Sequence, residues 1–367
     1  MNVLHTECSM NWGGQEYRTL REHNYLNSNG HKSWIMCHPD SGFFKKAEEL
    51  GCGNLVAMDF SKSWKLNIAI KVLRFCKRQK IDIINSHGSR DSLLCLLSFI
   101  YGIPLIRSRH ITSRVKKRTS YQYGCLHVIA TAKAIKEILV NIGVDESRVT
   151  VMGESVDLNK FNPNNNSDYL RKEFNIKNHD KIIVNIGMIR SDKGQKYYIE
   201  AAREVLKRNK DVRFFLVGEG TGNKKLEIEL RDMINTYGMS ENFFMTGYRD
   251  DVASFIHLSD FTVIASVGVE AQSQIVPQTF ATRRTVVCTN VGGLTELVQD
   301  GVTGLVIPPG DVKAMNSAII RLIEDDNLRN KLQENAYMMA VNDLSFEHLM
   351  DKMINLYYRF IPKPKKC

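Results

Sequence analysis

The sequence predicts an α/β protein built from two doubly wound domains in tandem, facing each other across a cleft. Short β-rich runs alternate with longer helical patterns in the first half, and the alternation restarts after the polar residues 159–168. Strands that alternate with helices favour parallel sheets covered by helices on both faces. The 367 residues also suit two domains of ordinary size. We therefore expect domains at residues 1–160 and 161–344.

The first domain is expected to begin with a strand at Asn2–His5 and a helix at Gly14–Asn29, which Gly30 closes. A later helical pattern runs from Thr131, a suitable N-cap, to Gly143, a suitable stop. The further strands expected in this domain are Ser33–Cys37, Asn54–Met58, Ile81–Ser86, Pro104–Ser108 and His127–Ala130. Ligands of such sheets bind outside the carboxyl ends of the strands, so the site is expected there.

The polar segment Asn159–Asp168 is the predicted linker, because it contains a proline and has no apolar period. The second domain then begins with a buried-looking strand at residues 181–186. Its further strands are expected at Arg213–Val217, Phe243–Thr246, Phe261–Ala265 and Thr285–Cys288. A last helical pattern, Ser345–Phe360, lies beyond them, and the sequence leaves open whether residues 345–367 cross back to the first domain.

The composition is that of a soluble globular protein, with 43% hydrophobic and 25% charged residues. The longest apolar run, Ser92–Ile106, is interrupted by Gly102 and Pro104 and is shorter than the about 20 residues that a spanning helix needs. The amino terminus shows no signal-peptide pattern. The eight cysteines include no CxxC pair, which favours buried thiols in a reducing compartment. These features predict a cytoplasmic protein.

The formal net charge of +10 has two interpretations that the sequence leaves open. No nucleic-acid recognition motif is present, so we expect no nucleic-acid partner. A basic cluster at residues 107–118 consists of Arg107, Arg109, His110, Arg114, Lys116, Lys117 and Arg118, and the tail adds Lys363, Lys365 and Lys366. Such a cluster binds anionic headgroups at about 1 kcal/mol per residue, or it is simply a solvated face. The first interpretation makes this a peripheral protein on the inner face of the cytoplasmic membrane.

The segment Glu270–Asp311 carries the main functional signal. Glu270 stands at the start of a predicted helix, with Gln278 eight positions later, and the pair Gly292-Gly293 opens another short helix. Backbone amides and helix N-termini bind phosphates, while carboxylates and carboxamides bind hydroxyls. This combination of groups suits a sugar joined to a diphosphate. The segment therefore predicts a glycosyltransferase that uses a sugar nucleotide.

Further candidates follow other predicted strands. Arg190 and Lys193 lie in the turn after the strand at 181–186. Their two positive charges are placed there to bind a leaving diphosphate. Gly218 belongs to an incomplete glycine motif and indicates either a tight turn near the nucleotide or an ordinary turn. Gly13 and Gly14 open the first helix, where backbone amides approach a phosphate closely.

His87 and His110 both stand at predicted strand ends of the first domain, which favours a functional role over a structural one. The chain contains no Asp-x-Asp, zinc spacing, GxSxG or P-loop. We therefore expect no metal and no cofactor, with the diphosphate charge met by Arg190, Lys193 and helix dipoles.

Together these residues resemble the family 4 glycosyltransferases, retaining enzymes with the GT-B fold of two Rossmann-like domains. The resemblance spans nearly the whole chain, is most specific at VGGLTELVQDGVTGLVIPPGD, and is closest to bacterial enzymes of lipopolysaccharide and capsule biosynthesis. It implies that Glu270 binds donor-sugar hydroxyls and that Arg190 and Lys193 bind the diphosphate. It also implies that Gly14 lies near the phosphates and His110 beside the reacting centre. The amides that it assigns to the sugar and diphosphate follow Glu270 directly, in Ala271, Gln272, Ser273 and Gln274.

The chain departs from the family at Gln278, where a second glutamate usually grips the ribose hydroxyls. A carboxamide still forms hydrogen bonds but loses about 1 kcal/mol of charge-assisted strength. The expected donor is a UDP-, GDP- or ADP-sugar, and the expected acceptor is a lipid-linked or lipopolysaccharide or capsule glycan. Two alternatives remain: a sugar-nucleotide epimerase of the same architecture, and a non-catalytic membrane-associated scaffold.

Overall fold

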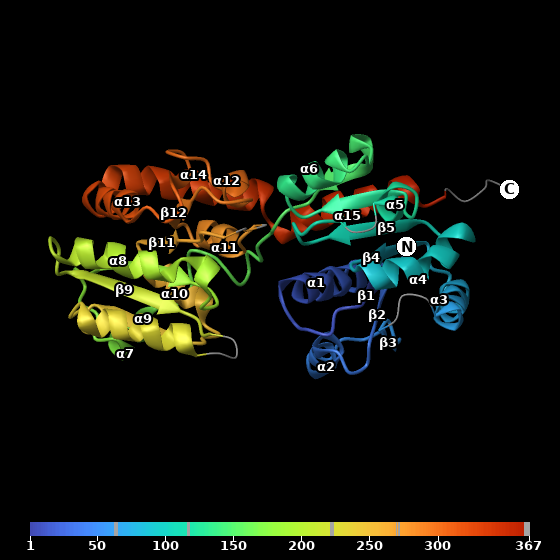
Figure 1. The fold of residues 1–367 in the computed structure, drawn as a ribbon, viewed down its shortest axis with the longest axis horizontal. Coiled ribbons are helices and arrows are strands. Elements are labelled where there is room, and N and C mark those ends of the chain that lie inside the picture. The colour runs from blue at the N-terminus through green and yellow to red at the C-terminus, as the bar shows by residue number, and fades with distance from the viewer. Residues whose placement is uncertain (62–64, 116–117, 221–223, 269, 271, 363–367) are drawn as a thin grey trace. The chain divides into compact units, whose positions relative to one another are not determined.

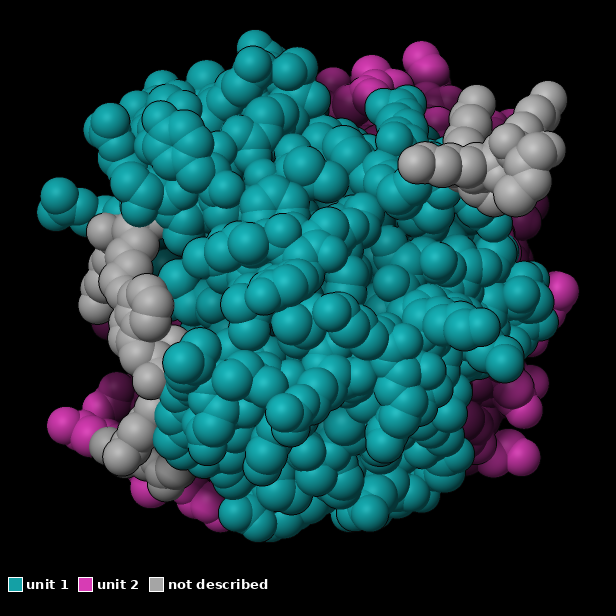
Figure 2. Space-filling view, turned by 90° about the vertical axis from the view of Figure 1, so that its right-hand side faces the viewer, with its two compact units in different colours: residues 1–153, 349–367 teal, residues 154–348 magenta. Residues whose placement is uncertain are grey.

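The computed structural model describes the chain except for residues 62–64, 116–117, 221–223, 269, 271 and 363–367. The chain forms two compact units (Figure 2). Unit 1 contains Met1–Gly153 and Leu349–Cys367, and unit 2 contains Glu154–His348. No helix among the described residues is long and apolar enough to cross a membrane.

Unit 1 contains a seven-stranded parallel sheet in the order β3-β2-β1-β4-β5-β6-β7 (Figure 1). Its strands are β1 (Asn2–Glu7), β2 (Lys32–Cys37), β3 (Leu55–Ala57), β4 (Ile83–Ser86), β5 (Leu105–Arg109), β6 (His127–Ala130) and β7 (Val149–Val151). Its helices are α1 (Gly14–Ser28), α2 (Gly42–Glu49), α3 (Leu66–Arg78), α4 (Ser89–Ile100), α5 (Thr119–Gln122), α6 (Lys133–Asn141) and the 3-10 turn η1 (Glu146–Arg148). The strand order reverses between β1 and β4, which places the expected ligand site at the carboxyl ends of these two strands.

Unit 2 repeats this plan with a six-stranded sheet in the order β10-β9-β8-β11-β12-β13. Its strands are β8 (Lys181–Ile186), β9 (Val212–Val217), β10 (Phe243–Gly247), β11 (Phe261–Ile264), β12 (Thr285–Thr289) and β13 (Gly304–Ile307). Its helices are α7 (Asp168–Glu173), η2 (Ser191–Lys193), α8 (Gln195–Leu206), α9 (Lys225–Thr236), α10 (Val252–Leu258), α11 (Ile275–Ala281), α12 (Leu294–Leu297), α13 (Val312–Glu324) and α14 (Asp326–Asp343). Here the order reverses between β8 and β11.

Both faces of each sheet are covered, which explains the nearly continuous apolar strands. In β8, Ile183 packs in the core formed with α8, α9 and α13, whereas Ile182 and Val184 pack on the opposite side with Phe215. All of these side chains are fully buried. The prediction of two doubly wound α/β domains is therefore confirmed.

The predicted linker at residues 159–168 is wrong. Phe161 is buried in the core of unit 2 beside Val276 and Phe280, and Ser167 Oγ lies 3.0 Å from His257 Nδ1. The polar segment is thus attached to unit 2 by one anchoring aromatic ring and a side-chain hydrogen bond. The chain changes units at Gly153–Glu154, ahead of the predicted position at residue 160.

The last helix, α15 (Phe346–Phe360), begins in unit 2 and belongs to unit 1 from Leu349 onward. Its buried residues include Met350, Met353 and Tyr357. Asn85 Nδ2, in β4, donates a 2.8 Å hydrogen bond to the buried Tyr357 hydroxyl. This bond fixes the end of α15 against the central strands of unit 1.

Replacing Tyr357 with Phe is expected to destabilise the protein by about 1–3 kcal/mol, because the buried Asn85 amide then lacks an acceptor. Chemical denaturation of the full chain measures this change. The control is Tyr358→Phe, since Tyr358 is 53% exposed, and surface changes of this kind stay within about 0.5 kcal/mol. Equal stabilities of the two variants would contradict the assignment.

Candidate active site

In unit 2, Lys193 and Glu270 form one ion pair at the strand-order reversal. Lys193 closes the turn after β8, and Glu270 follows β11. Lys193 Nζ lies 2.9 Å from Glu270 Oε1 and 2.6 Å from Oε2, and Ser266 Oγ donates to Oε2 at 2.9 Å. Both side chains keep some exposure, 27% for Lys193 and 12% for Glu270. The two residues that the sequence predicted as a phosphate ligand and a sugar ligand are therefore in direct contact.

The backbone around this pair is tightly interlocked. Asp192 O accepts hydrogen bonds from Val267 N at 2.8 Å and Gly268 N at 3.1 Å, which joins the turn after β8 to the turn after β11. Gly194 has φ +67°, and a Cβ there would lie 1.9 Å from the Ala265 carbonyl oxygen. Only glycine allows this approach. Lys193 is thereby held in a fixed position relative to Glu270.

The pair Gly292-Gly293 contacts the Glu270 backbone. The sequence predicted instead that the backbone amides of this pair bind a phosphate. A Cβ on Gly292, whose φ is +52°, would lie 1.9 Å from the Glu270 carbonyl oxygen. Gly293 N donates to that oxygen at 2.9 Å, so its N–H is already occupied.

Arg190 makes a two-point ion pair with Asp192, at 2.9 Å from Nε and 2.6 Å from Nη2. Its side chain is 52% exposed. Arg190 and Lys193 thus lie in one turn, as predicted, but each already has a carboxylate partner. A diphosphate that binds both cations has to compete with Asp192 and Glu270.

The residues after Glu270 divide into two groups. Gln272 is occupied, since its Oε1 accepts from Glu154 N at 2.7 Å and its Nε2 donates to Glu296 Oε2 at 3.0 Å. Ser273 and Gln274 are half-buried at the start of α11, and their backbone N–H groups have no partner among the described residues. The predicted residue Ala271 lies outside the described residues. The Gln278 Oε1 atom is buried and makes no hydrogen bond within the described structure.

A pocket of about 340 Å³ lies at the carboxyl ends of β8, β9 and β10. Apolar groups dominate its lining, which consists of Ile186, Gly187, Met188, Val217, Gly218, Glu219, Tyr248, Arg249 and Val252. Gly218 lies so close to Gly187 that a Cβ would stand 2.1 Å from the Gly187 carbonyl oxygen. Tyr248 and Arg249 were not predicted from the sequence, although they directly follow β10, where ligands of such sheets are expected to bind.

In unit 1, three histidines form a row across neighbouring strands. His5 Nδ1 lies 3.1 Å from His87 Nε2, and His87 Nδ1 lies 3.1 Å from His110 Nε2. Adjacent rings are stacked with centroids 5.4 Å apart. Burial lowers the pKa of His5 to about 3 and also lowers the pKa values of His87 and His110. A neutral imidazole has one donor and one acceptor nitrogen, so the row has a single hydrogen-bond direction.

His5, Glu22 and His87 each bring one atom within 4.8 Å of the others and offer the donor types that metals bind. Arg18 Nε already donates to Glu22 Oε1 at 2.9 Å, and this cation supplies the positive charge that the carboxylate needs. Two buried atoms of this cluster, His5 Nε2 and Glu22 Oε2, have no hydrogen-bond partner among the described residues.

The start of α1 has a different environment from the one predicted. Gly13 is extended, and a Cβ there would make only an ordinary contact at 3.4 Å, so no tight approach requires this glycine. Nearby, burial and the Asp91 charge raise the pKa of Glu7 to about 8, and Gln15 donates to its carboxyl group. Glu7 is therefore an acid that keeps its proton near neutral pH at the end of β1. Neither Glu7 nor His5 was predicted as a site residue from the sequence.

The basic cluster of residues 107–118 is not one exposed surface. Arg107 and Arg109 are 2% and 7% exposed, because both lie in β5. Arg114 and Arg118 are exposed, while Lys116 and Lys117 lie outside the described residues, as do Lys363, Lys365 and Lys366. The expectation that the whole cluster contacts headgroups is therefore wrong for the two arginines of β5.

Comparison with known proteins identifies both units. The model of glycosyl transferases group 1 matches residues 166–339, and that of glycosyltransferase family 4 matches residues 12–160. An α-D-kanosaminyltransferase of Streptomyces kanamyceticus is 31% identical over 48% of this chain and 45% of that protein. The UDP-Gal:α-D-GlcNAc-diphosphoundecaprenol α-1,3-galactosyltransferase of Escherichia coli is 25% identical over 78% of each chain. A capsular polysaccharide biosynthesis glycosyltransferase of Staphylococcus aureus is 23% identical over 81% of each.

Solved structures agree on the fold. A glycosyltransferase from Rickettsia africae superposes with a TM-score of 0.90 at 20% identity, over 99% of both chains. An Anabaena protein solved with UDP-glucose superposes with a TM-score of 0.80 at 20% identity, over 98% of this chain and all of that one. The predicted GT-B fold is thereby confirmed. The chain therefore belongs to the glycosyltransferases, with a family 4 domain in its first unit and a group 1 domain in its second.

Proposed function

We propose that the chain transfers a hexose-type sugar from a nucleotide diphosphate-sugar to a lipid-linked, lipopolysaccharide or capsule glycan acceptor. The observation that carries this proposal is the Lys193–Glu270 pair, because it combines a phosphate ligand and a hydroxyl ligand in one place. Relatives in Escherichia coli and Staphylococcus aureus are named for a diphosphoundecaprenol acceptor and for capsular polysaccharide, which supports the acceptor class. The reaction takes place at the inner face of the cytoplasmic membrane, where Arg114 and Arg118 attract anionic headgroups.

When the donor binds, Lys193 and Glu270 exchange part of their mutual ion pair for hydrogen bonds with the donor. Two Lys193 protons point at Glu270, so the third is available to a phosphate oxygen. As the diphosphate attracts Lys193, carboxylate lone pairs of Glu270 become free to accept hydrogen bonds from sugar hydroxyls. The apolar pocket beside Gly218 and Tyr248 suits the base of the nucleotide. The amides of Ser273 and Gln274, which have no partner among the described residues, add donors for the diphosphate.

Transfer proceeds with retention at the anomeric carbon, on one face of the sugar. The leaving diphosphate oxygen takes the acceptor's proton, and the positive charges of Lys193 and Arg190 stabilise the negative charge that develops on it. In this proposal no metal ion takes part, because these two side chains provide the compensating charge.

Replacing Glu270 with Gln is expected to lower kcat/KM by about 10- to 100-fold, since hydrogen bonds to a charged group contribute about 1.5–3 kcal/mol. Glu270→Ala is expected to abolish transfer. Initial rates with the accepted donor measure both effects. Glu204→Gln is the control because Glu204 forms an ion pair with Lys207 at the surface. Full activity of Glu270→Ala would refute the site.

Chelation of divalent metals is expected to leave the rate within about twofold, because Lys193 and Arg190 carry the charge compensation that a metal otherwise supplies. The measurement compares initial rates of the purified enzyme before and after dialysis against EDTA. Loss of activity that added Mg²⁺ or Mn²⁺ restores would refute metal independence.

The histidine row makes stability depend on pH. The unfolded histidines titrate near 6.5, whereas the pKa of folded His5 is about 3, so the unfolded state binds more protons between these values. The contribution of the neutral histidines to the free energy of unfolding is therefore fully present above about pH 6.5. It falls as the pH drops toward 3, by about 1.4 kcal/mol per pH unit for each histidine. Denaturation at pH 7.5 and 5.0 measures this loss. His5→Gln should reduce the loss relative to the exposed control His179→Gln, and an unchanged loss would contradict the assignment.

A further inference from the structure

The two arginines of β5 carry buried charge without a carboxylate partner. Arg107 and Arg109 are 2% and 7% exposed, and no acidic side chain of the described chain forms an ion pair with either. Arg107 Nη1 donates to Ser120 Oγ at 2.9 Å, and its guanidinium lies 3.7 Å from the ring centre of Tyr121. A buried cation is costly unless an anion compensates it, so this region lacks a counter-charge.

Arg109 has hydrogen-bonding capacity left over. Its Nη1 donates to the Tyr121 hydroxyl at 3.1 Å, and its Nη2 donates to the Ser113 carbonyl. Its Nε is buried and has no partner among the described residues. An N–H left in this state costs about as much as a lost hydrogen bond, and an anionic oxygen would satisfy it.

Arg109 lines a pocket of about 320 Å³ next to the start of α4. The other charged residues of its lining are Arg90 and Arg114, so every charge around this pocket is positive. Among the described residues, the Arg90 guanidinium donates to the carbonyl oxygens of Ser61 and Cys8. Arginine forks match the oxygens of phosphate groups, which makes a phosphate or diphosphate the fitting anion.

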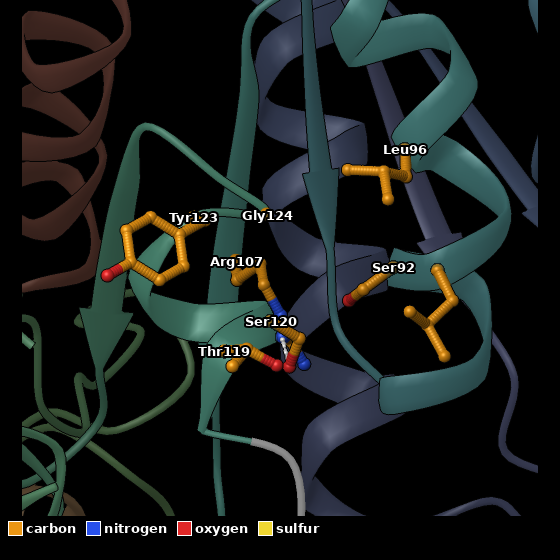
Figure 3. Close-up of a pocket in the computed structure, with 8 residues that line it drawn as sticks. Ser92, Leu96, Arg107, Thr119, Ser120, Tyr123 and Gly124 are labelled. Carbon is orange, nitrogen blue, oxygen red and sulfur yellow. Dashed lines mark hydrogen bonds between the residues drawn. The ribbon is translucent and has the colours of Figure 1, made fainter.

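A second pocket, of about 280 Å³, adjoins the first through the shared residues Leu93 and Ser120. Figure 3 shows Leu96 projecting from α4 on one side of it and Tyr123, from the end of the α5 segment, on the other, with Arg107 between them. Leu93, Leu96 and Tyr123 make this pocket mainly apolar. Tyr123 is 77% exposed and Ile111, in the first pocket, is 57% exposed, so apolar groups also stand at the openings of both pockets.

We propose that these adjoining pockets bind a phosphorylated lipid, with its phosphate or diphosphate on Arg109, Arg90 and Arg114 and its hydrocarbon chain along Leu93, Leu96 and Tyr123. The occupant is the lipid carrier of the glycan acceptor, so this inference rests on the proposed function. Charge complementarity selects the phosphate, since the first pocket contains cations and no acid. The apolar second pocket selects a hydrocarbon chain over a free sugar phosphate.

Isothermal titration calorimetry of the full chain tests the proposal with farnesyl diphosphate, a water-soluble isoprenoid diphosphate. Farnesyl diphosphate is expected to bind at least tenfold more tightly than inorganic diphosphate or farnesol, because only it fills both pockets. Arg114→Gln should weaken its binding by roughly tenfold through loss of a charged contact, and Tyr123→Ser by roughly fivefold through loss of apolar contact. Both side chains are exposed, so both variants are expected to fold.

The exposed variant Arg208→Gln is the matched control and should bind farnesyl diphosphate as the unmodified chain does. Lys193→Gln should also bind it unchanged, which excludes the diphosphate ligands of unit 2 as the source of the signal. Equal binding of inorganic diphosphate, or unchanged binding in both Arg114→Gln and Tyr123→Ser, would overturn the proposal. Displacement of farnesyl diphosphate by phosphatidylglycerol vesicles at equal phosphate concentration would assign the site to bulk lipid instead and would also overturn it.

The outcome can be separated from that of the proposed function by a thermal-shift screen with UDP-, GDP-, ADP- and TDP-sugars on the same protein. If a nucleotide sugar stabilises the protein but farnesyl diphosphate does not bind, only the lipid site is refuted. Farnesyl diphosphate binding without any stabilising nucleotide sugar refutes the proposed donor chemistry instead.

Discussion

The site of the second unit depends on the ion pair between Lys193 and Glu270. The pair joins the turns that follow β8 and β11, the two strands between which the strand order reverses. A half-buried carboxylate without a partner would be unfavourable, and Lys193 removes that cost before any ligand arrives. Donor binding thus exchanges one set of charge-assisted hydrogen bonds for another. The close backbone contacts at Gly194 and Gly292 hold Lys193 and Glu270 in fixed positions relative to each other. They also explain why glycine is required at those two positions.

The fold and half of the site follow from the sequence by a simple physical rule. Strands alternating with helices imply parallel sheets, and residues just after such strands gather at one edge. Arg190, Lys193, His87 and His110 were predicted by this rule, whereas Glu270 was predicted from its place before a helix in the segment 270–311. His5 and Glu7 were not predicted, although the predicted strand Asn2–His5 ends beside them. Their contacts come from residues distant in sequence or in the following helix, His87 for His5 and Gln15 for Glu7. The short strands β7 and β13 were also missed, since three or four apolar residues next to turns have no measurable period.

Three expectations were wrong for a common reason: sequence patterns report the type of a group but not what already occupies it. The polar residues 159–168 read as a linker, yet one phenylalanine anchors them in a core. The amide of Gly293 reads as a phosphate ligand, yet it is bonded to the Glu270 carbonyl. Arg107 and Arg109 read as surface charge, yet their position in a central strand buries them. Burial changes the functional interpretation of these two arginines, because a cation enclosed by neutral groups gains more from a bound anion than an exposed cation does.

The last helix has a consequence for how the protein is made. Unit 1 is complete only when α15 packs onto it, yet the ribosome synthesises the whole of unit 2 between Gly153 and Leu349. At translation rates of about 5–20 residues per second, the first sheet waits roughly 10 to 40 seconds for its final helix. During that time the Asn85 amide and the apolar surface that covers Met350 and Met353 in the finished protein remain open. Vectorial synthesis thus leaves the first unit as an unfinished intermediate until α15 has been synthesised and has packed onto it.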